Sequence, residues 1–382
     1  MNPNFFKKYA VLHCCAILIV VTAYAAGQAG RLDNTFGNGG IASQQTTVSQ
    51  TSNFYSVGAV AIQTDGKIVV VGGVPGSNDF AVPAVLRFLA NGGLDRNFAV
   101  NGVFVLPNSF GSYAALAIQP DGKILIGTSA AGPNAEVDRL TTTGHLDSSF
   151  GSNGRVTFRL SELLGMALQP DGRILAALQS ITGGKPQVAR LQSSGSTDNS
   201  FGTNGFAFLP GVGGPPEVLG NGDILICGGF VSRLTSSGAL DTTFGVNGQL
   251  LAQTSAHASA ADGDILTAGT LISNPAVPTT GLGAFSYLSV GIGDPAFGRN
   301  GGALTAFPGF PTVAAAGLGL ESTGGIVVLG TVSNSTTGAL GLVRFTALGQ
   351  LDTSSGDLTA TATSAGCNRL GNCYRHSSEV SH

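Results

Sequence analysis

An aspartate recurs along the chain about every fifty residues, each time inside a phrase of the form LDxxFGxxG. The phrase contains Asp33, Asp95, Asp147, Asp198, Asp241 and Asp294, and a shorter copy, LDTSSG, adds Asp352. Hard cations such as Ca²⁺ take several oxygen ligands, so carboxylates repeated on one edge of a protein could bind Ca²⁺. Apart from this ion, the sequence suggests no cofactor.

A structural role explains the same aspartates more simply. An aspartate in a turn accepts hydrogen bonds from backbone N–H groups that follow it in the chain. A phenylalanine stands three residues later and has the size to fill the space between two sheets. These rings are Phe36, Phe98, Phe150, Phe201, Phe244 and Phe297. We therefore favour a repeated structural turn over a metal site.

An arginine stands eight residues before most of these aspartates. It is found at Arg87, Arg139, Arg190, Arg233 and Arg344, whereas Ser286 takes its place before Asp294. Only 10% of the chain is charged, so a fixed spacing of opposite charges indicates an ion pair. A guanidinium group also makes several directed hydrogen bonds. We predict that the pairs stabilise the junctions between repeats; the alternative is a ring of arginines that binds an acidic ligand.

The residues that could support catalysis are few. Histidine is scarce, and only His145 and His257 lie within the repeats. A repeat protein would place a catalytic site at polar residues that do not recur, which leaves four weak candidates: Glu217, His257, Asp262 and Asp264. The chain contains no GxSxG, HExxH or phosphate-binding loop motif. No reaction follows from these residues.

The elements that must position these residues are strands. QPDGKIL at residues 119–125 returns as QPDGRIL at 169–175 and as QTDGKIV at 63–69. Apolar runs on both sides of Asp-Gly predict a β-hairpin, for which we expect a type I′ turn with two residues of positive φ. Each repeat then has one strand after the Asn-Gly of the phrase, two strands around the hairpin tip and one that leads into the next phrase.

Six such repeats occupy residues 31–353. Four strands in a period of about fifty residues are typical of a propeller blade. We therefore predict an all-β fold, a six-bladed β-propeller of four-stranded antiparallel blades. The partial phrases at residues 32–40 and 351–356 are two parts of one junction, which favours a closed ring. An open β-solenoid is the alternative, and it would require polar caps at both ends.

The combination of LDxxFGxxG, QPDGKIL and LxRLxxxGxLD resembles the delta-60 repeat, a β-propeller-type repeat of bacterial exported or surface proteins. The resemblance extends up to residue 353. It weakens in the later hairpins, which read LGNGDIL, AADGDIL and STGGIVV. The resemblance implies an architecture and an extracellular setting, and it implies no defined reaction.

Both ends of the chain differ from the repeats. Lys7 and Lys8, an apolar run and Ala23-Tyr24-Ala25 predict a signal peptide over residues 1–25, with a retained membrane anchor as the alternative. Residues 354–382 are polar and predict a flexible tail. In this tail Cys367 and Cys373 could form a disulfide, or bind a metal with His376. Cys227 lies in an apolar run and is expected to be a buried thiol.

Composition limits the class of partner. A net charge of −3 provides no basic surface for nucleic acid or anionic membranes, and no second apolar span follows the leader. We expect a secreted or cell-surface monomer that acts as a binding scaffold for a glycan, a peptide or a surface protein. The alternative is an exported hydrolase or lyase that acts on a polysaccharide or a small ester at the axial channel.

Overall fold

The computed structural model describes residues 32–43, 56–75, 81–106, 111–130, 134–211, 213–228, 230–250, 255–260, 262–272, 280–307, 309–335, 338–353 and 359–360. The predicted signal peptide and the residues Cys367, Cys373 and His376 lie outside these ranges. All regular structure in the described part of the chain is β-strand. Within the same ranges there is no helix with the length and hydropathy needed to cross a membrane.

The chain divides into two compact units, an N-terminal unit (Met1–Ala252) and a C-terminal unit (Gln253–His382). Four four-stranded sheets are described in the N-terminal unit. The first contains β1 (Ser56–Ile62), β2 (Ile68–Pro75), β3 (Ala81–Phe88) and β4 (Val103–Val105). The second contains β5 (Gly111–Ile118), β6 (Ile124–Ala130), β7 (Asn134–Leu140) and β8 (Arg155–Arg159). The third contains β9 (Ser161–Leu168), β10 (Ile174–Ser180), β11 (Gln187–Leu191) and β12 (Phe206–Phe208). The fourth contains β13 (Pro216–Val218), β14 (Ile224–Cys227), β15 (Val231–Leu234) and β16 (Gln249–Leu250).

Two further four-stranded sheets are described in the C-terminal unit. The fifth sheet contains β17 (Ala256–Ser259), β18 (Ile265–Ile272), β19 (Thr280–Tyr287) and β20 (Gly302–Ala306). The sixth contains β21 (Thr312–Leu320), β22 (Ile326–Ser333), β23 (Gly338–Phe345) and β24 (Thr359–Ala360). The last strand lies in the segment predicted as a flexible tail. The prediction of an all-β fold with four-stranded antiparallel sheets is confirmed for the described residues.

In every sheet the strands pair antiparallel and in chain order. The strand that follows the Asn-Gly of a phrase pairs with the strand that precedes the same phrase. In the second sheet, for example, β8 lies against β7, with Val156 opposite Val137. The repeat pattern predicts this strand as part of the following repeat, and that prediction is wrong. The phrase connects the third and fourth strands of one sheet, because its backbone folds back onto the third strand. Asp147 N–H donates to the Arg139 carbonyl at 2.8 Å, and Arg139 N–H donates to the Gly154 carbonyl at 2.9 Å.

The Asp-Gly hairpins are present, but their turns are not type I′. In the second sheet Gly122 N–H donates to the Gln119 carbonyl at 2.8 Å, and Gln119 N–H donates to the Lys123 carbonyl at 2.8 Å. Only the glycine of this loop has a positive φ, of +81°. This is a three-residue loop, a type I turn followed by a left-handed glycine. Pro120 favours this geometry, because proline holds φ near −65° and suits the second position of a type I turn. The first sheet forms the same turn with Thr64 at this position.

The type I′ geometry occurs instead at the Asn-Gly of the phrase. In the second sheet Asn153 has a φ of +53° and Gly154 a φ of +94°. Ser152 and Arg155 exchange both backbone hydrogen bonds around them, at 2.7 Å and 3.2 Å. Asparagine tolerates the left-handed region better than other non-glycine residues, so Asn-Gly suits this turn.

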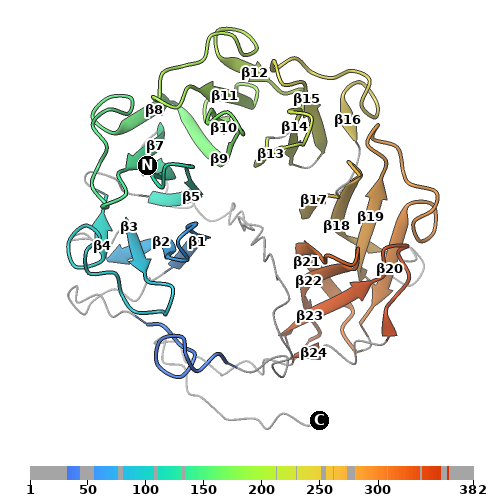
Figure 1. Cartoon of the computed structure of the whole chain (residues 1–382). Coiled ribbons are helices and arrows are strands. Elements are labelled where there is room, and N and C mark those ends of the chain that lie inside the picture. Colours follow the sequence, from blue (N-terminus) through green and yellow to red (C-terminus); the bar gives the residue numbers. More distant parts are fainter. Residues whose placement is uncertain are drawn as a thin grey trace, which may run out of the picture. The chain divides into compact units, whose positions relative to one another are not determined.

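Within the N-terminal unit the sheets lie beside one another in chain order, and β5 packs against β1 and β9 (Figure 1). An apolar cluster separates each pair of neighbours. Leu125 and Val137 of the second sheet, for example, pack against Ile174 and Ala176 of the third. Equivalent clusters lie between the first and second sheets and between the third and fourth sheets. In the C-terminal unit one cluster joins the fifth and sixth sheets. Each sheet thus buries a face that it could not bury alone.

Four buried phenylalanines of the phrase, Phe98, Phe150, Phe201 and Phe297, lie at these contacts. Phe98, Phe150, Phe201 and Phe244 are fully buried and Phe297 is 1% exposed, whereas Phe36 is only half-buried. Phe150 lies against Gly195, which belongs to the turn after the third strand of the next sheet. Gly151 N–H donates to the Ser194 carbonyl of that turn at 2.9 Å. A ring and a backbone hydrogen bond therefore join one sheet to the next.

Replacing Gly195 by alanine should destabilise the protein for two reasons. Its φ is +86°, and an added Cβ would lie 2.7 Å from the Gly151 nitrogen and 2.9 Å from the Phe150 ring. Gly183 is a matched control, because its φ is +85° and no atom lies within 4 Å of its added Cβ. We expect Gly183→Ala to cost about 1 kcal/mol of unfolding free energy and Gly195→Ala more than about 2 kcal/mol. Urea unfolding compares the two variants; equal losses would contradict the close packing at Gly195.

Candidate functional site

The repeated aspartates close turns. One carboxylate oxygen, Oδ1, accepts a hydrogen bond from the backbone N–H two residues further on. The distances are 2.9 Å at Asp33, 3.2 Å at Asp95, 3.1 Å at Asp147, 3.2 Å at Asp198, 3.0 Å at Asp241 and 2.9 Å at Asp294. No group of three or more His, Cys, Asp or Glu residues that could hold a metal ion occurs in the described ranges. Ca²⁺ binding stays a prediction.

The other carboxylate oxygen, Oδ2, faces the arginine eight residues earlier. The N–O distances are 2.9 Å for Arg87–Asp95, 2.9 Å for Arg139–Asp147, 2.7 Å for Arg190–Asp198, 2.7 Å for Arg233–Asp241 and 2.7 Å for Arg344–Asp352. Both members of the first three pairs are buried. Water screens such pairs little, so each charge depends on its partner.

Four of these arginines also lie over a phenylalanine ring, and three of them donate to a carbonyl of the next sheet. The guanidinium carbon lies 4.4 to 4.5 Å from the centre of the phenylalanine ring of the phrase, at Phe98, Phe150, Phe201 and Phe244. Arg87 also donates to the Thr142 carbonyl of the next sheet at 2.6 Å, and Arg190 donates to the Ser236 carbonyl at 2.6 Å. Arg139 donates in the same way to the Ser193 carbonyl. We refer to this set of contacts, an arginine with an aspartate, a ring and a carbonyl of the next sheet, as the arginine junction.

A second cation reaches the aspartate in two sheets. It comes from the residue two positions after the hairpin aspartate. Lys123 Nζ lies 3.2 Å from Asp147, and Arg173 Nε lies 3.1 Å from Asp198. Burial raises the pKa of Asp147, but the hydrogen bonds from Ser149 and Lys123 and the charge of Arg139 outweigh it and lower the pKa to about 2. Asp147 is thus ionised throughout the physiological range.

The four weak catalytic candidates do not form one described cluster. Glu217 lies on β13 of the N-terminal unit, whereas the other three belong to the C-terminal unit. His257 lies on β17 opposite Thr267. Asp262 and Asp264 lie in the turn between β17 and β18, where Asp264 N–H donates to Asp262 Oδ1 at 3.1 Å. No described contact brings the four candidates to a common point.

Glu217 lies near the buried thiol of Cys227. Burial raises the pKa of Cys227 well above its usual value, and the negative charge of Glu217 raises it further. A thiol with a raised pKa is protonated and a poor nucleophile. Cys227 therefore contributes to packing in the fourth sheet.

A buried ion cluster in the second sheet was missed by the sequence analysis. Arg155 on β8 lies 2.7 Å from Asp138 and 3.1 Å from Glu136, both on β7. Asp138 is completely buried, and burial raises its pKa to about 6 although Arg155 opposes the shift. The only signal in the sequence is two carboxylates in AEVDRL, at positions where the other repeats have uncharged residues.

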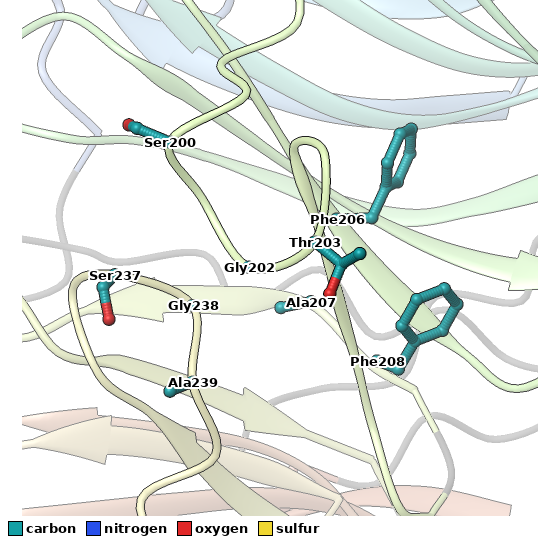
Figure 2. Close-up of a pocket in the computed structure, with 9 residues that line it drawn as sticks. All are labelled: Ser200, Gly202, Thr203, Phe206, Ala207, Phe208, Ser237, Gly238 and Ala239. Atoms are coloured by element: carbon teal, nitrogen blue, oxygen red, sulfur yellow. The ribbon is translucent and has the colours of Figure 1, made fainter.

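A groove lies at the surface between the third and fourth sheets (Figure 2). Its volume is about 390 Å³, and it is lined by Ser200, Gly202, Thr203, Phe206, Ala207, Phe208, Ser237, Gly238 and Ala239. None of these residues is charged. Phe208 is 55% exposed, and its ring lies on the same side of β12 as that of Phe206 (Figure 2). Hydroxyl groups beside an exposed aromatic ring suit a neutral, polar ligand.

Replacing Arg139 by methionine should destabilise the protein. Among the described residues, the change leaves the buried Asp147 paired with Lys123 alone. Removing one partner of a buried ion pair costs about 3 to 5 kcal/mol, and Lys123 should keep the loss near the lower end. The exposed Arg159 is the control, since surface changes usually stay within about 0.5 kcal/mol. Thermal and urea unfolding measure both variants; equal stability of Arg139→Met and Arg159→Met would show that the arginine junction is solvated.

Asp138 should make stability depend on pH in the opposite sense to Asp147. Its pKa is about 6 in the folded protein, above the value of 3.8 expected for an unfolded chain. The native state therefore binds the carboxyl proton more tightly than the unfolded chain does. The stabilisation that this proton binding provides is lost as the pH rises from about 4 to about 6. The variant Asp138→Asn has no carboxyl group at this position. Its free energy of unfolding, relative to that of the natural protein, should therefore increase as the pH rises from about 4 to about 6. Urea unfolding at several pH values measures the difference, and a constant difference contradicts the assignment.

Comparisons with known proteins agree with the repeat architecture. Residues 63–98, 119–150, 169–201 and 321–354 match the model of a β-propeller domain of unknown function, DUF5122. Each matched segment runs from a hairpin tip through the third strand into the phrase. No curated protein matches the chain. The β-propeller-type repeat is thus supported by family comparison as well as by the described sheets.

Three solved structures illustrate the structural similarity. A quinonprotein alcohol dehydrogenase-like protein from Bacteroides thetaiotaomicron is 12% identical, with a TM-score of 0.43, over 81% of this chain and 67% of that one. The PQQ-bound aldose sugar dehydrogenase from Streptomyces coelicolor is 11% identical, with a TM-score of 0.38, over 75% and 91%. The polysaccharide lyase Uly1 is 12% identical, with a TM-score of 0.39, over 81% and 82%. At these values the similarities support no inference about activity.

Proposed function

We propose that this protein is a secreted or cell-surface β-propeller of the delta-60 type that acts as a binding scaffold. The predicted signal peptide supports export. The six described sheets would form the six blades of one closed ring, with the first and last phrases meeting at the final junction. The spacing of the repeats and the order of the sheets within each unit support this arrangement.

The observation that carries the binding role is the groove between the third and fourth sheets. It combines an exposed aromatic ring, Phe208, with the hydroxyl of Thr203, which is exposed. Aromatic side chains with a few polar groups beside them are typical of the lining of ligand-binding sites. A carbohydrate offers C–H faces for the ring and hydroxyls for the polar groups, so we assign the groove to a glycan.

The walls of the groove are held in place by the arginine junction. Gly202 N–H donates to the Ser237 carbonyl at 2.8 Å, and Arg190 donates to the neighbouring Ser236 carbonyl at 2.6 Å. The loop at Gly202 and the turn at Ser237 therefore keep a fixed separation before a ligand binds. Such preorganisation reduces the entropy lost on binding.

The groove can be tested with the mature protein on a glycan array. We expect binding to a subset of neutral glycans, and Phe208→Ala should weaken it about tenfold, equivalent to about 1.4 kcal/mol. Val105→Ala is the matched control, because Val105 ends β4 as Phe208 ends β12 and is 48% exposed. Unchanged binding by Phe208→Ala, with a melting temperature equal to that of the natural protein, would exclude the groove. Hydrolysis or cleavage of a bound glycan would instead support the enzyme alternative.

A further inference from the structure

The dipeptide Asn-Gly occurs eight times in the chain, and its asparagines are Asn38, Asn91, Asn101, Asn153, Asn204, Asn221, Asn247 and Asn300. Asparagine is a thermolabile residue. Before glycine it can modify itself, because the glycine nitrogen can attack the side-chain amide. The attack needs a glycine N–H that is free to lose its proton and a backbone that can bend toward the side chain. The eight pairs differ in both respects.

In seven of the pairs the glycine N–H is held by a hydrogen bond. It donates to a backbone carbonyl three or four residues earlier, at 2.7 to 2.9 Å. The glycines are Gly92, Gly102, Gly154, Gly205, Gly222, Gly248 and Gly301. Six of them are buried, and Gly222 is half-buried. Their N–H protons are therefore bonded and poorly accessible to a base from solvent.

The pair Asn38-Gly39 is different. Both residues are exposed, and no described atom outside the neighbouring residues lies within 4 Å of a Cβ added to Gly39. No described group accepts a hydrogen bond from Gly39 N–H, and no described hydrogen bond holds the side-chain amide of Asn38. The attacking nitrogen and the amide that it attacks thus belong to exposed residues.

A shift of one residue explains the difference. In the second sheet Asn153 and Gly154 are the two central residues of the type I′ turn. In the first phrase, LDNTFGNGG, the central residues are Gly39 and Gly40, with φ values of +61° and +89°. Gly40 N–H donates to the Phe36 carbonyl at 2.8 Å, in the place of the hydrogen bond from Gly154. The asparagine of this phrase therefore stands before the turn, and the glycine after it is the residue whose N–H the turn does not use.

The turn at Asn38 is also held by fewer contacts than its equivalents. Asn38 and Ile41 exchange two backbone hydrogen bonds, at 2.8 Å and 3.3 Å. After the equivalent turn of the second sheet, Arg155 begins a strand that pairs with β7. Ile41 begins no described strand. The local opening that the attack requires therefore costs less free energy at Asn38.

We propose that Asn38 is a site of spontaneous deamidation. The Gly39 nitrogen forms a bond to Cγ of Asn38 and gives up its proton, which passes through solvent to the side-chain nitrogen. The bond between Cγ and that nitrogen breaks, and ammonia leaves. Water then opens the resulting succinimide ring at one of its two carbonyls, which yields aspartate or isoaspartate. Water is the only co-reactant.

Isoaspartate at this position would loosen the first phrase from the first sheet. It adds a carbon atom to the backbone of the turn, which disrupts the hydrogen bonds across it. The neighbouring Gly37 N–H donates to the Asn91 carbonyl at 2.6 Å, and the ring of Phe36 lies against Gly92. These contacts connect the phrase to the first sheet. The modification therefore acts on stability and is independent of the glycan groove, which lies between the third and fourth sheets.

The test is peptide mapping by mass spectrometry after incubation of the folded mature protein at mildly alkaline pH, which favours loss of the amide proton. We expect Asn38 to deamidate roughly tenfold faster, or more, than the asparagine of any other Asn-Gly pair, because a protecting hydrogen bond is absent there. In urea-unfolded protein all eight pairs should react at similar rates, since the protecting hydrogen bonds are lost. Equal rates for the eight pairs in the folded protein would overturn the proposal.

A double variant decides whether the position of the pair is the cause. Asn38→Ser with Gly39→Asn gives the phrase the residue order of positions 152–154 and moves the Asn-Gly pair onto Gly40. The chemistry of the pair is unchanged, but its glycine N–H is now the one that donates to the Phe36 carbonyl. We expect deamidation to slow to the rate of the other pairs. Undiminished deamidation of the folded double variant would contradict the protection by the turn.

A single variant identifies the reacting residue if the double variant does not fold. Asn34 lies in the same part of the chain and also carries an amide. Asn38→Ser removes one amide and keeps Asn34, so the deamidated fragment should be absent from this variant. A fragment that is still deamidated would assign the reaction to Asn34 and exclude Asn38.

Discussion

A four-stranded sheet of short strands cannot bury its own apolar faces, and the contact between neighbouring sheets solves this problem. The contact is built around the phenylalanine of the repeated phrase. Its ring lies against a glycine of the next sheet, and an arginine covers its face while bonding to an aspartate and to a carbonyl of that sheet. Packing, charge and hydrogen bonding thus meet at one place in the first, second and third sheets, and the position of the following sheet depends on this place.

The arginine junction is costly to disturb because its charges are buried. A buried carboxylate is tolerated only when it is paired and hydrogen-bonded. Asp147 fulfils this condition through Ser149, Lys123 and Arg139, and its pKa falls to about 2. Asp138 does so only partly, and its pKa rises to about 6. The two residues differ because one belongs to the repeated junction and the other does not.

Function is to be sought where the repeats differ from one another. Local departures from a consistent pattern are expected at functional sites, since they are not required by the fold. The groove beside Phe208 is one such departure. It uses the repeated backbone as a rigid support and changes only the side chains presented on it. A repeat protein can acquire different binding sites in this way without a change of fold.

Much of this organisation can be predicted from the sequence, because it depends on local rules. The phrase period predicts four strands per repeat, Asp-Gly and Asn-Gly predict turns, and a spacing of eight residues identifies partners such as Arg139 and Asp147. These features follow from the reach of the chain between positions close in sequence. The type I′ prediction at Asp121-Gly122 is wrong, and Pro120 before this pair favours the type I turn that the structure shows.

Other features are decided only by the tertiary structure, because they depend on groups far apart in the chain. The pairing of β8 with β7, the depth at which Asp138 is buried and the acceptance of an Arg139 hydrogen bond by Ser193 all require the sheets to be in place. The groove arises in the same way, where the loop at Thr203 meets the turn at Ser237 of another sheet. The sequence by itself thus determined the repeated unit and its turns, since these follow from neighbouring residues. Burial, electrostatics and the groove come from contacts between sheets, which no short stretch of sequence encodes.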